Sequence, residues 1–184
     1  MSKVSLAGNA SGTGIFTIAS PNSNTDRTLT LPDNTGTLLS TASTITQNSG
    51  PAFSAYRNAT QTISSGTFTK FQANIERFDT ASCYDTSTNR FTPNVAGYYS
   101  VKIGNWWTTG TGSTAASIFR NGSAVYTEYD YQVGGLTARC EGLLYLNGTT
   151  DYVEAYLWQS SGSNQDTDSS AVNPGFQAFL VRTA

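Results

Sequence analysis

The chain has 184 residues, of which 38% are hydrophobic and only 12% are charged. This charged share is about half that of an ordinary soluble domain, so neutral polar residues must keep the chain in solution. The net charge of -2, with no cluster of Lys and Arg, argues against a nucleic-acid partner. The absence of histidine excludes a Ser-His-Asp triad, a Cys-His pair and a His-ligated zinc site. The composition therefore favours a binding or structural protein over an enzyme.

The N-terminus lacks the apolar core of a secretory signal, and no stretch of the sequence is long and apolar enough to span a membrane. We therefore expect synthesis in the cytoplasm and no membrane insertion. The two cysteines, Cys83 and Cys140, lie far apart and do not form a metal-type pair. We expect two free, buried thiols, with a disulfide between them as the alternative.

Residues 1–49 differ sharply in composition from the rest of the chain, because Phe16 is their only aromatic residue. Such a segment cannot bury enough apolar surface to fold alone. Short alternating runs at 14–19 and 27–32 are separated by turn residues, and a Ser/Thr-rich linker covers 40–49. We predict an extended N-terminal anchor or shaft segment whose thin apolar face is buried when several chains wind together. A flexible tail is the alternative.

Residues 50–184 alternate between apolar and polar side chains almost throughout, which is typical of strands with one buried face. The expected strands begin around Phe53 and around Phe68, and continue in the later segments 98–107, 116–126, 143–146, 152–158 and 176–181. Asn121-Gly122 and Asn147-Gly148 are predicted to be hairpin turns, since Asn-Gly favours the positive φ angles of a type I′ turn. With no helical apolar stripe, the pattern predicts an all-β protein with an antiparallel two-sheet sandwich or jelly roll as its head domain.

Several short motifs follow one another through this head domain in a characteristic order. They are Pro51-Ala52-Phe53-Ser54-Ala55-Tyr56, Phe78-Asp79-Thr80, Tyr84-Asp85, Phe91-Thr92-Pro93, Gly97-Tyr98-Tyr99, Phe119-Arg120-Asn121-Gly122, Asp151-Tyr152-Val153-Glu154 and Gly175-Phe176-Gln177-Ala178-Phe179-Leu180. The order resembles the globular head shared by the complement recognition subcomponent and the tumour necrosis factor superfamily. The resemblance implies a jelly roll that forms a tight homotrimer around an aromatic-rich seam, and it places Tyr98, Tyr99 and Phe179 at that seam.

Residues 21–39 carry a second resemblance, through Arg27-Thr28-Leu29-Thr30-Leu31-Pro32 and Asp33-Asn34-Thr35-Gly36. This segment is similar to one found in tail-fibre and other virion proteins of bacteriophages, where it winds into a thin shaft or attaches to the particle. The resemblance implies a virion location and contacts with other virion proteins through residues 1–45.

Five residues between positions 126 and 131 form an acidic and aromatic cluster: Tyr126, Glu128, Tyr129, Asp130 and Tyr131. We predict that this segment is a loop that binds a saccharide, because Tyr offers both a stacking face and a hydroxyl group. A loop tucked against a neighbouring subunit is the alternative.

Acidic and amide side chains at two places are candidate calcium ligands. Asn164, Asp166 and Asp168 alternate along a polar loop, although this run lacks the central Gly and final Glu of an EF-hand. Asp79 and Asp85 lie where related heads sometimes hold calcium. A solvated loop without metal is the alternative at both places, and no other cofactor is expected.

Taken together, these features predict a structural protein of a bacteriophage virion: a homotrimeric short fibre or spike whose head binds a glycan or protein on the host surface. A second hypothesis is a capsid decoration or cement protein, in which the head binds other virion subunits. A third is a polysaccharide-depolymerising tailspike, but such enzymes are usually built on a long β-helix, and the chain lacks its repeats. We therefore expect no enzymatic activity.

Overall fold

The computed structural model describes residues 11–15, 17, 19, 22–26, 28, 50–109, 112–131 and 136–184. The chain divides into two compact units, Met1–Thr44 and Ile45–Ala184. Residues described in the first unit form turns and bends, while most of the strand positions expected there lie outside the described residues. The second unit contains the head domain, and all the strands below belong to it.

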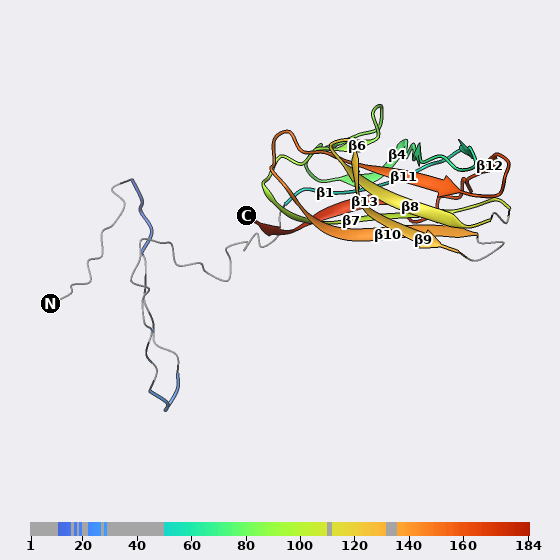
Figure 1. The fold of residues 1–184 in the computed structure, drawn as a ribbon. Coiled ribbons are helices and arrows are strands. Elements are labelled where there is room, and N and C mark those ends of the chain that lie inside the picture. The colour runs from blue at the N-terminus through green and yellow to red at the C-terminus, as the bar shows by residue number, and fades with distance from the viewer. Residues whose placement is uncertain are drawn as a thin grey trace. The chain divides into compact units, whose positions relative to one another are not determined.

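The head is a sandwich of two antiparallel sheets (Figure 1). The first sheet has the strand order β10-β7-β13-β1-β4. Its strands are β1 (Ala52–Tyr56), β4 (Ile75–Asp79), β7 (Gly97–Trp106), β10 (Thr137–Leu146) and β13 (Gly175–Thr183). Long strands with matched registers, such as the ten-residue pair of β7 and β10, give this sheet a broad outward face.

The second sheet has the order β5-β6-β11-β8-β9, and β3 also pairs with β11. Its strands are β3 (Thr69–Lys70), β5 (Tyr84–Asp85), β6 (Arg90–Phe91), β8 (Thr114–Arg120), β9 (Ser123–Asp130) and β11 (Val153–Gln159). A small third sheet pairs β2 (Thr62–Ile63) with β12 (Gln165–Asp166). The described residues form no helix, and none could therefore cross a membrane as a helix. The predicted all-β jelly roll is confirmed.

One of the two predicted Asn-Gly hairpins is present. Asn121 and Gly122 have φ angles of 52° and 81° and join β8 to β9. The prediction for Asn147-Gly148 is wrong, because β10 pairs with β7 in one sheet and β11 pairs with β8 in the other. This loop crosses between the sheets and is held by Asn147 Oδ1, which accepts hydrogen bonds from the N–H groups of three following residues, Thr149, Thr150 and Asp151.

Aromatic rings fill the centre of the sandwich. Phe53 stacks on Tyr84 and Phe91, with ring centroids 4.4 and 4.7 Å away, and meets Phe176 edge-on at 5.0 Å. Tyr99 is fully buried beside them, and its hydroxyl donates to the Val95 carbonyl over 2.7 Å. Because these rings come from strands of both sheets, they fix how the two layers pack.

A buried carboxylate on the outward side of the second sheet is neutralised by two cations. Glu154 is 2% exposed, and its Oε1 lies 2.6 Å from Lys70 Nζ and 2.7 Å from Arg90 Nε. Burial raises the pKa of Glu154, but the hydrogen bonds and charges of Lys70 and Arg90 lower it by more, so the net pKa lies below its ordinary value.

Glu154→Gln should therefore destabilise the head by about 2 kcal/mol at pH 7. This cost is smaller than that of breaking a fully buried ion pair, because both cations can reach water. Folding lowers the Glu154 pKa, so the ionised carboxylate stabilises the folded head. This stabilisation is present above pH 4.5, the pKa of Glu154 in the unfolded chain, and is lost as the pH falls through the lower pKa in the folded head. Urea unfolding of both proteins at pH 7 and pH 3 checks this: the difference should be large at pH 7 and shrink at pH 3. An equal difference at both pH values would contradict it.

The two cysteines are free and buried, as the sequence predicts. Burial, followed by the nearby Glu128 charge, raises the pKa of Cys140 to about 11, and burial also raises that of Cys83. At pH 8 the folded head should therefore react with iodoacetamide at least about a hundredfold more slowly than the urea-unfolded chain. Mass spectrometry of quenched samples gives both rates, and rapid labelling of the folded protein would contradict the burial of the thiols.

Candidate functional site

Five apolar side chains lie exposed together on β7, β10 and β13, on the outward face of the first sheet, and we call them the apolar patch. They are Tyr98, Leu143, Tyr145, Phe179 and Val181, each 40–54% exposed. The strand registers bring them together: Tyr145 pairs with Tyr98, and Ser100 of β7 lies between Leu143 and Phe179. Exposed apolar clusters of this kind on a small domain commonly mark an interaction surface.

Strand alternation separates the two neighbouring tyrosines that the resemblance assigns to a seam. Tyr98 faces outward and meets Tyr145 edge-on, with ring centroids 5.7 Å apart. Tyr99 faces into the sandwich and has no exposed surface. The prediction that Tyr99 lines a subunit seam is therefore wrong, and Tyr98 and Phe179 are the predicted seam residues that are accessible. A groove of about 580 Å³ beside Tyr98 and Leu143 continues the patch to the C-terminus at Ala184.

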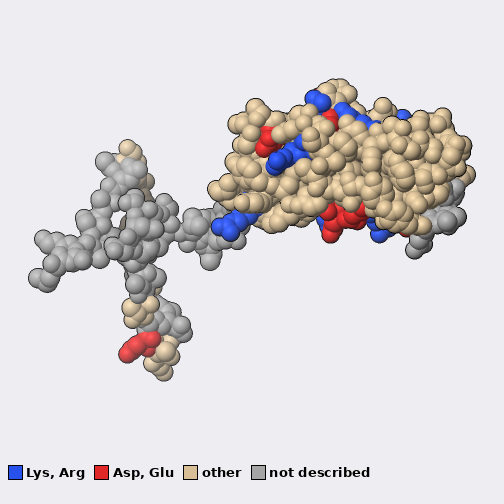
Figure 2. Space-filling view, viewed as in Figure 1, with Lys and Arg blue, Asp and Glu red and all other residues tan. Residues whose placement is uncertain are grey.

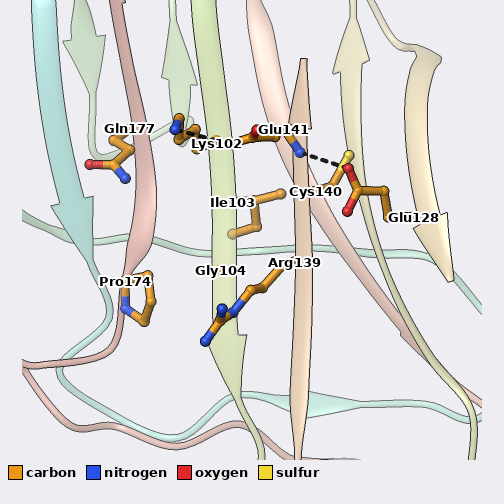
Figure 3. Close-up of a pocket in the computed structure, with 9 residues that line it drawn as sticks. All are labelled: Lys102, Ile103, Gly104, Glu128, Arg139, Cys140, Glu141, Pro174 and Gln177. Carbon is orange, nitrogen blue, oxygen red and sulfur yellow. Dashed lines mark hydrogen bonds and ion pairs between the residues drawn. The ribbon is translucent and has the colours of Figure 1, made fainter. Parts of the chain in front are cut away.

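A pocket of about 450 Å³ opens on the same face, next to the apolar patch (Figure 3). Lys102 and Glu141 pair across it with 2.9 Å between Nζ and Oε2, and Glu128 Oε1 accepts a hydrogen bond from the Glu141 N–H over 3.3 Å. Arg139 and Gln177 complete the polar lining. The register places Lys102 between Glu141 and Gln177, two residues along the strands from the apolar patch. The sheet face thus has an apolar part and a charged part.

The wall of this pocket at Pro174 is held by Arg77 of β4. The Arg77 guanidinium donates to the carbonyls of Ala171, Asn173 and Pro174 over 2.7, 2.6 and 3.2 Å. Cys140 supplies the pocket's thiol, and its pKa of about 11 keeps it protonated at neutral pH. The two basic and two acidic side chains of this lining, Lys102, Arg139, Glu128 and Glu141, suit binding through charge pairs.

Four of the five residues of the predicted saccharide loop lie in strand β9 and Tyr131 follows it, so the residues alternate between two sides. Tyr126 and Glu128 face β10, where the Tyr126 hydroxyl donates to the Leu143 carbonyl over 2.7 Å. Glu128, Tyr129 and Asp130 line a smaller hollow of about 160 Å³, to which Tyr126 and Tyr131 do not contribute. Tyr129 stacks on Tyr131, with centroids 5.6 Å apart and planes 13° apart. The five predicted residues therefore do not form one surface.

Tyr129 and Tyr131 belong instead to a row of rings on the outward side of the second sheet, which we call the aromatic row. Its six members are Tyr156, Phe119, Phe68, Trp158, Tyr129 and Tyr131, and their successive centroids lie 4.0–6.3 Å apart. Four of these rings were not predicted as site residues. They come from three separate segments of the chain, and only the strand pairing shows that these segments are neighbours.

The candidate calcium ligands are used for local hydrogen bonds. Asp166 accepts from Thr62, and Asp168 accepts from the Ser170 N–H. Asp79 accepts from the N–H groups of Ala81 and Tyr84. Hydrogen bonds from Ser87 and then Thr88 lower the pKa of Asp85 to about 2.

Asn164 is exposed beside Gln165 in the same run. Among the described residues there is no group of three or more His, Cys, Asp or Glu side chains that could hold a metal ion. A calcium site needs about six to eight oxygen ligands, and its presence at these residues stays a prediction.

Comparisons with solved structures agree with this architecture. The chain is similar to the globular domain of zebrafish complement 1qA protein, with a TM-score of 0.50 and 18% identity over 73% of this chain and 99% of that one. It is also similar to the Eiger TNF of S. frugiperda, with a TM-score of 0.52 and 9% identity over 73% of this chain and 93% of that one. Murine APRIL gives a TM-score of 0.50 and 12% identity over 71% of this chain and 98% of that one. No protein-family model and no curated protein sequence matches the chain. At these identities the similarity shows the fold alone: the head is a jelly roll of the complement-head and tumour necrosis factor type.

Proposed function

We propose that the chain is a homotrimeric attachment protein of a bacteriophage particle, a short fibre or spike. Residues 1–49 join the head to the particle, and the head binds a receptor on the host surface. The observation that carries the proposal is the apolar patch on the first sheet. The virion setting is supported by the resemblance of residues 21–39 to segments of bacteriophage virion proteins.

The apolar patch has the composition of an interface centre. Its exposed residues include two tyrosines, a phenylalanine and two aliphatic side chains, and aromatic residues are enriched at the buried centres of interfaces. The neighbouring Lys102–Glu141 pair supplies a polar margin. Three copies related by a closed three-fold axis would each cover the patch of a neighbour, which a single chain leaves in water.

The scarcity of charge favours the same assembly. In the view of Figure 2, few charged side chains lie on the end of the head that carries β12, and most of the visible head surface is uncharged. Little charge has to be desolvated when such surfaces meet. A trimer also presents three identical receptor sites, so contacts that are individually weak gain affinity through multivalency.

Two measurements test the attachment role. An antibody against the head should label the tail region of particles in electron micrographs, and excess purified protein should block adsorption of particles to host cells. Label over the capsid with no effect on adsorption would instead support capsid decoration and contradict host attachment. Shortening of host polysaccharide by the purified protein would contradict the non-enzymatic role.

Deleting residues 1–45 tests the proposed division of labour between the two parts of the chain. The shortened protein should remain folded and trimeric, should still block adsorption, and should no longer be incorporated into particles. Loss of folding, or normal incorporation, would contradict the assignment of particle attachment to this segment.

A further inference from the structure

We propose that the aromatic row on the second sheet is a binding platform for uncharged saccharide chains, with sugar rings stacking on Tyr129, Tyr131 and Trp158. This inference rests on the proposed attachment function and names the chemistry of the receptor. The segment predicted from the sequence to bind a saccharide contains two of these platform residues, Tyr129 and Tyr131. Its other three residues face another side of the molecule.

The platform has a rigid base and an open end. Phe119 and Tyr156 stack at 4.0 Å, and Phe68 packs against both Phe119 and Trp158 with centroids 6.3 Å apart. The row then leads through Trp158 to Tyr129, 46% exposed, and Tyr131, 73% exposed. Since the inner rings hold the outer ones, little side-chain freedom remains to be lost when a ligand binds.

The absence of charge in the row indicates an uncharged ligand. All six members are neutral, and two residues between them on β8, Ala115 and Ser117, are neutral as well. Beside the open end, Glu128, Asp130 and Arg139 line a hollow with Tyr129. At the far end of the row, Lys70 and Arg90 are paired with Glu154. An acidic polymer would find no cation among the six rings and would approach the carboxylates of Glu128 and Asp130. A neutral polymer brings no charge that must be desolvated.

The side chains at the open end have the dual character that a sugar ring requires. A pyranose has an apolar C–H face and polar edges, and Tyr and Trp likewise combine an apolar ring with a polar group at its edge. Tyr129, Tyr131 and Trp158 provide two hydroxyl groups and one indole N–H beside their rings. Tyrosine also contributes a large contact area with few rotatable bonds. These features favour a sugar over a purely apolar ligand.

The row remains accessible in the proposed trimer. It lies on the outward side of the second sheet, whereas the apolar patch lies on the first. Its open end, formed by Trp158, Tyr129 and Tyr131, lies toward the end of the strands away from Gly50, where the chain enters the head. At the entry end Gly148 approaches Ala96, whose carbonyl accepts from the Ala184 N–H. Trp158 and Tyr129 flank Ala115 near the other end of the strands.

Binding of the full chain to an array of neutral and acidic bacterial capsular and O-antigen polysaccharides tests the platform. We expect binding to at least one neutral polymer, weakened about tenfold by Tyr131→Ala and lost in Tyr129→Ala/Tyr131→Ala. Phe78→Ala, a matched exposed ring on β4, should bind like the unchanged protein. Binding to no neutral polymer, binding to acidic polymers alone, or full binding by Tyr131→Ala would each overturn the proposal.

Two further readouts on the same samples separate this inference from the attachment function. The oligomer mass of Tyr131→Ala should be unchanged, and dissociation would show that the row belongs to a subunit seam instead. In the adsorption assay Tyr131→Ala should compete at least about tenfold less well than the unchanged protein. If it competes equally well, attachment stands and the saccharide platform is wrong; if the unchanged protein does not compete, the attachment function itself fails.

Discussion

Phe179→Asp is expected to convert the proposed homotrimer into folded monomers. Phe179 is about half exposed in the single chain and lies at the centre of the apolar patch, across Ser100 from Leu143. In a trimer the substitution would bury three unpaired carboxylates among apolar side chains, and each unpaired buried charge costs several kcal/mol. Even a total loss of about 4 kcal/mol weakens assembly roughly a thousandfold.

Light scattering coupled to size-exclusion chromatography measures this effect at micromolar protein. The control is Val172→Asp, which places the same charge at a 73% exposed position outside the patch and should leave the oligomer intact. Circular dichroism should show that both variants keep the β-sheet fold. A trimeric Phe179→Asp protein would show that the patch is not the seam.

Phe53→Ala is expected to destabilise the head by about 4 kcal/mol, the usual range for removing a large buried ring. Phe53 is 1% exposed and contacts Tyr84, Phe91 and Phe176 from strands of both sheets. The cavity would remain because the neighbouring rings are held by their own strands.

Urea unfolding at one fixed protomer concentration measures this loss, since assembly couples stability to concentration. Phe78→Ala removes a half-exposed ring and should change stability by less than about 1 kcal/mol. A loss below about 1 kcal/mol for Phe53→Ala would contradict the central role of its ring cluster.

Most of the fold could be predicted because strand formation leaves a local signal. The alternation through residues 97–106 indicates a strand and shows that Tyr98 and Tyr99 face opposite sides. It cannot tell which of the two is buried, and the resemblance alone placed both at a seam. Asn121-Gly122 was predictable as a hairpin because its positive φ angles are a local property of the two residues.

The features that local patterns could not predict all depend on which strands pair. Asn147-Gly148 has the same dipeptide as the true hairpin, but its flanking strands join different sheets. The row formed by Phe68, Phe119, Trp158 and Tyr129 joins residues up to 90 positions apart, which only the register of β3, β8, β9 and β11 brings together. The acidic and aromatic residues of β9 were adjacent in sequence, yet the strand separates them.

Sedimentation equilibrium of the full chain tests the central claim most directly, because the proposed function depends on a head that assembles through its exposed sheet. At micromolar concentration we predict a single species with three times the 19.6 kDa mass of the chain. A species with the mass of one chain under the same conditions would contradict the trimer, and with it the role assigned to the apolar patch.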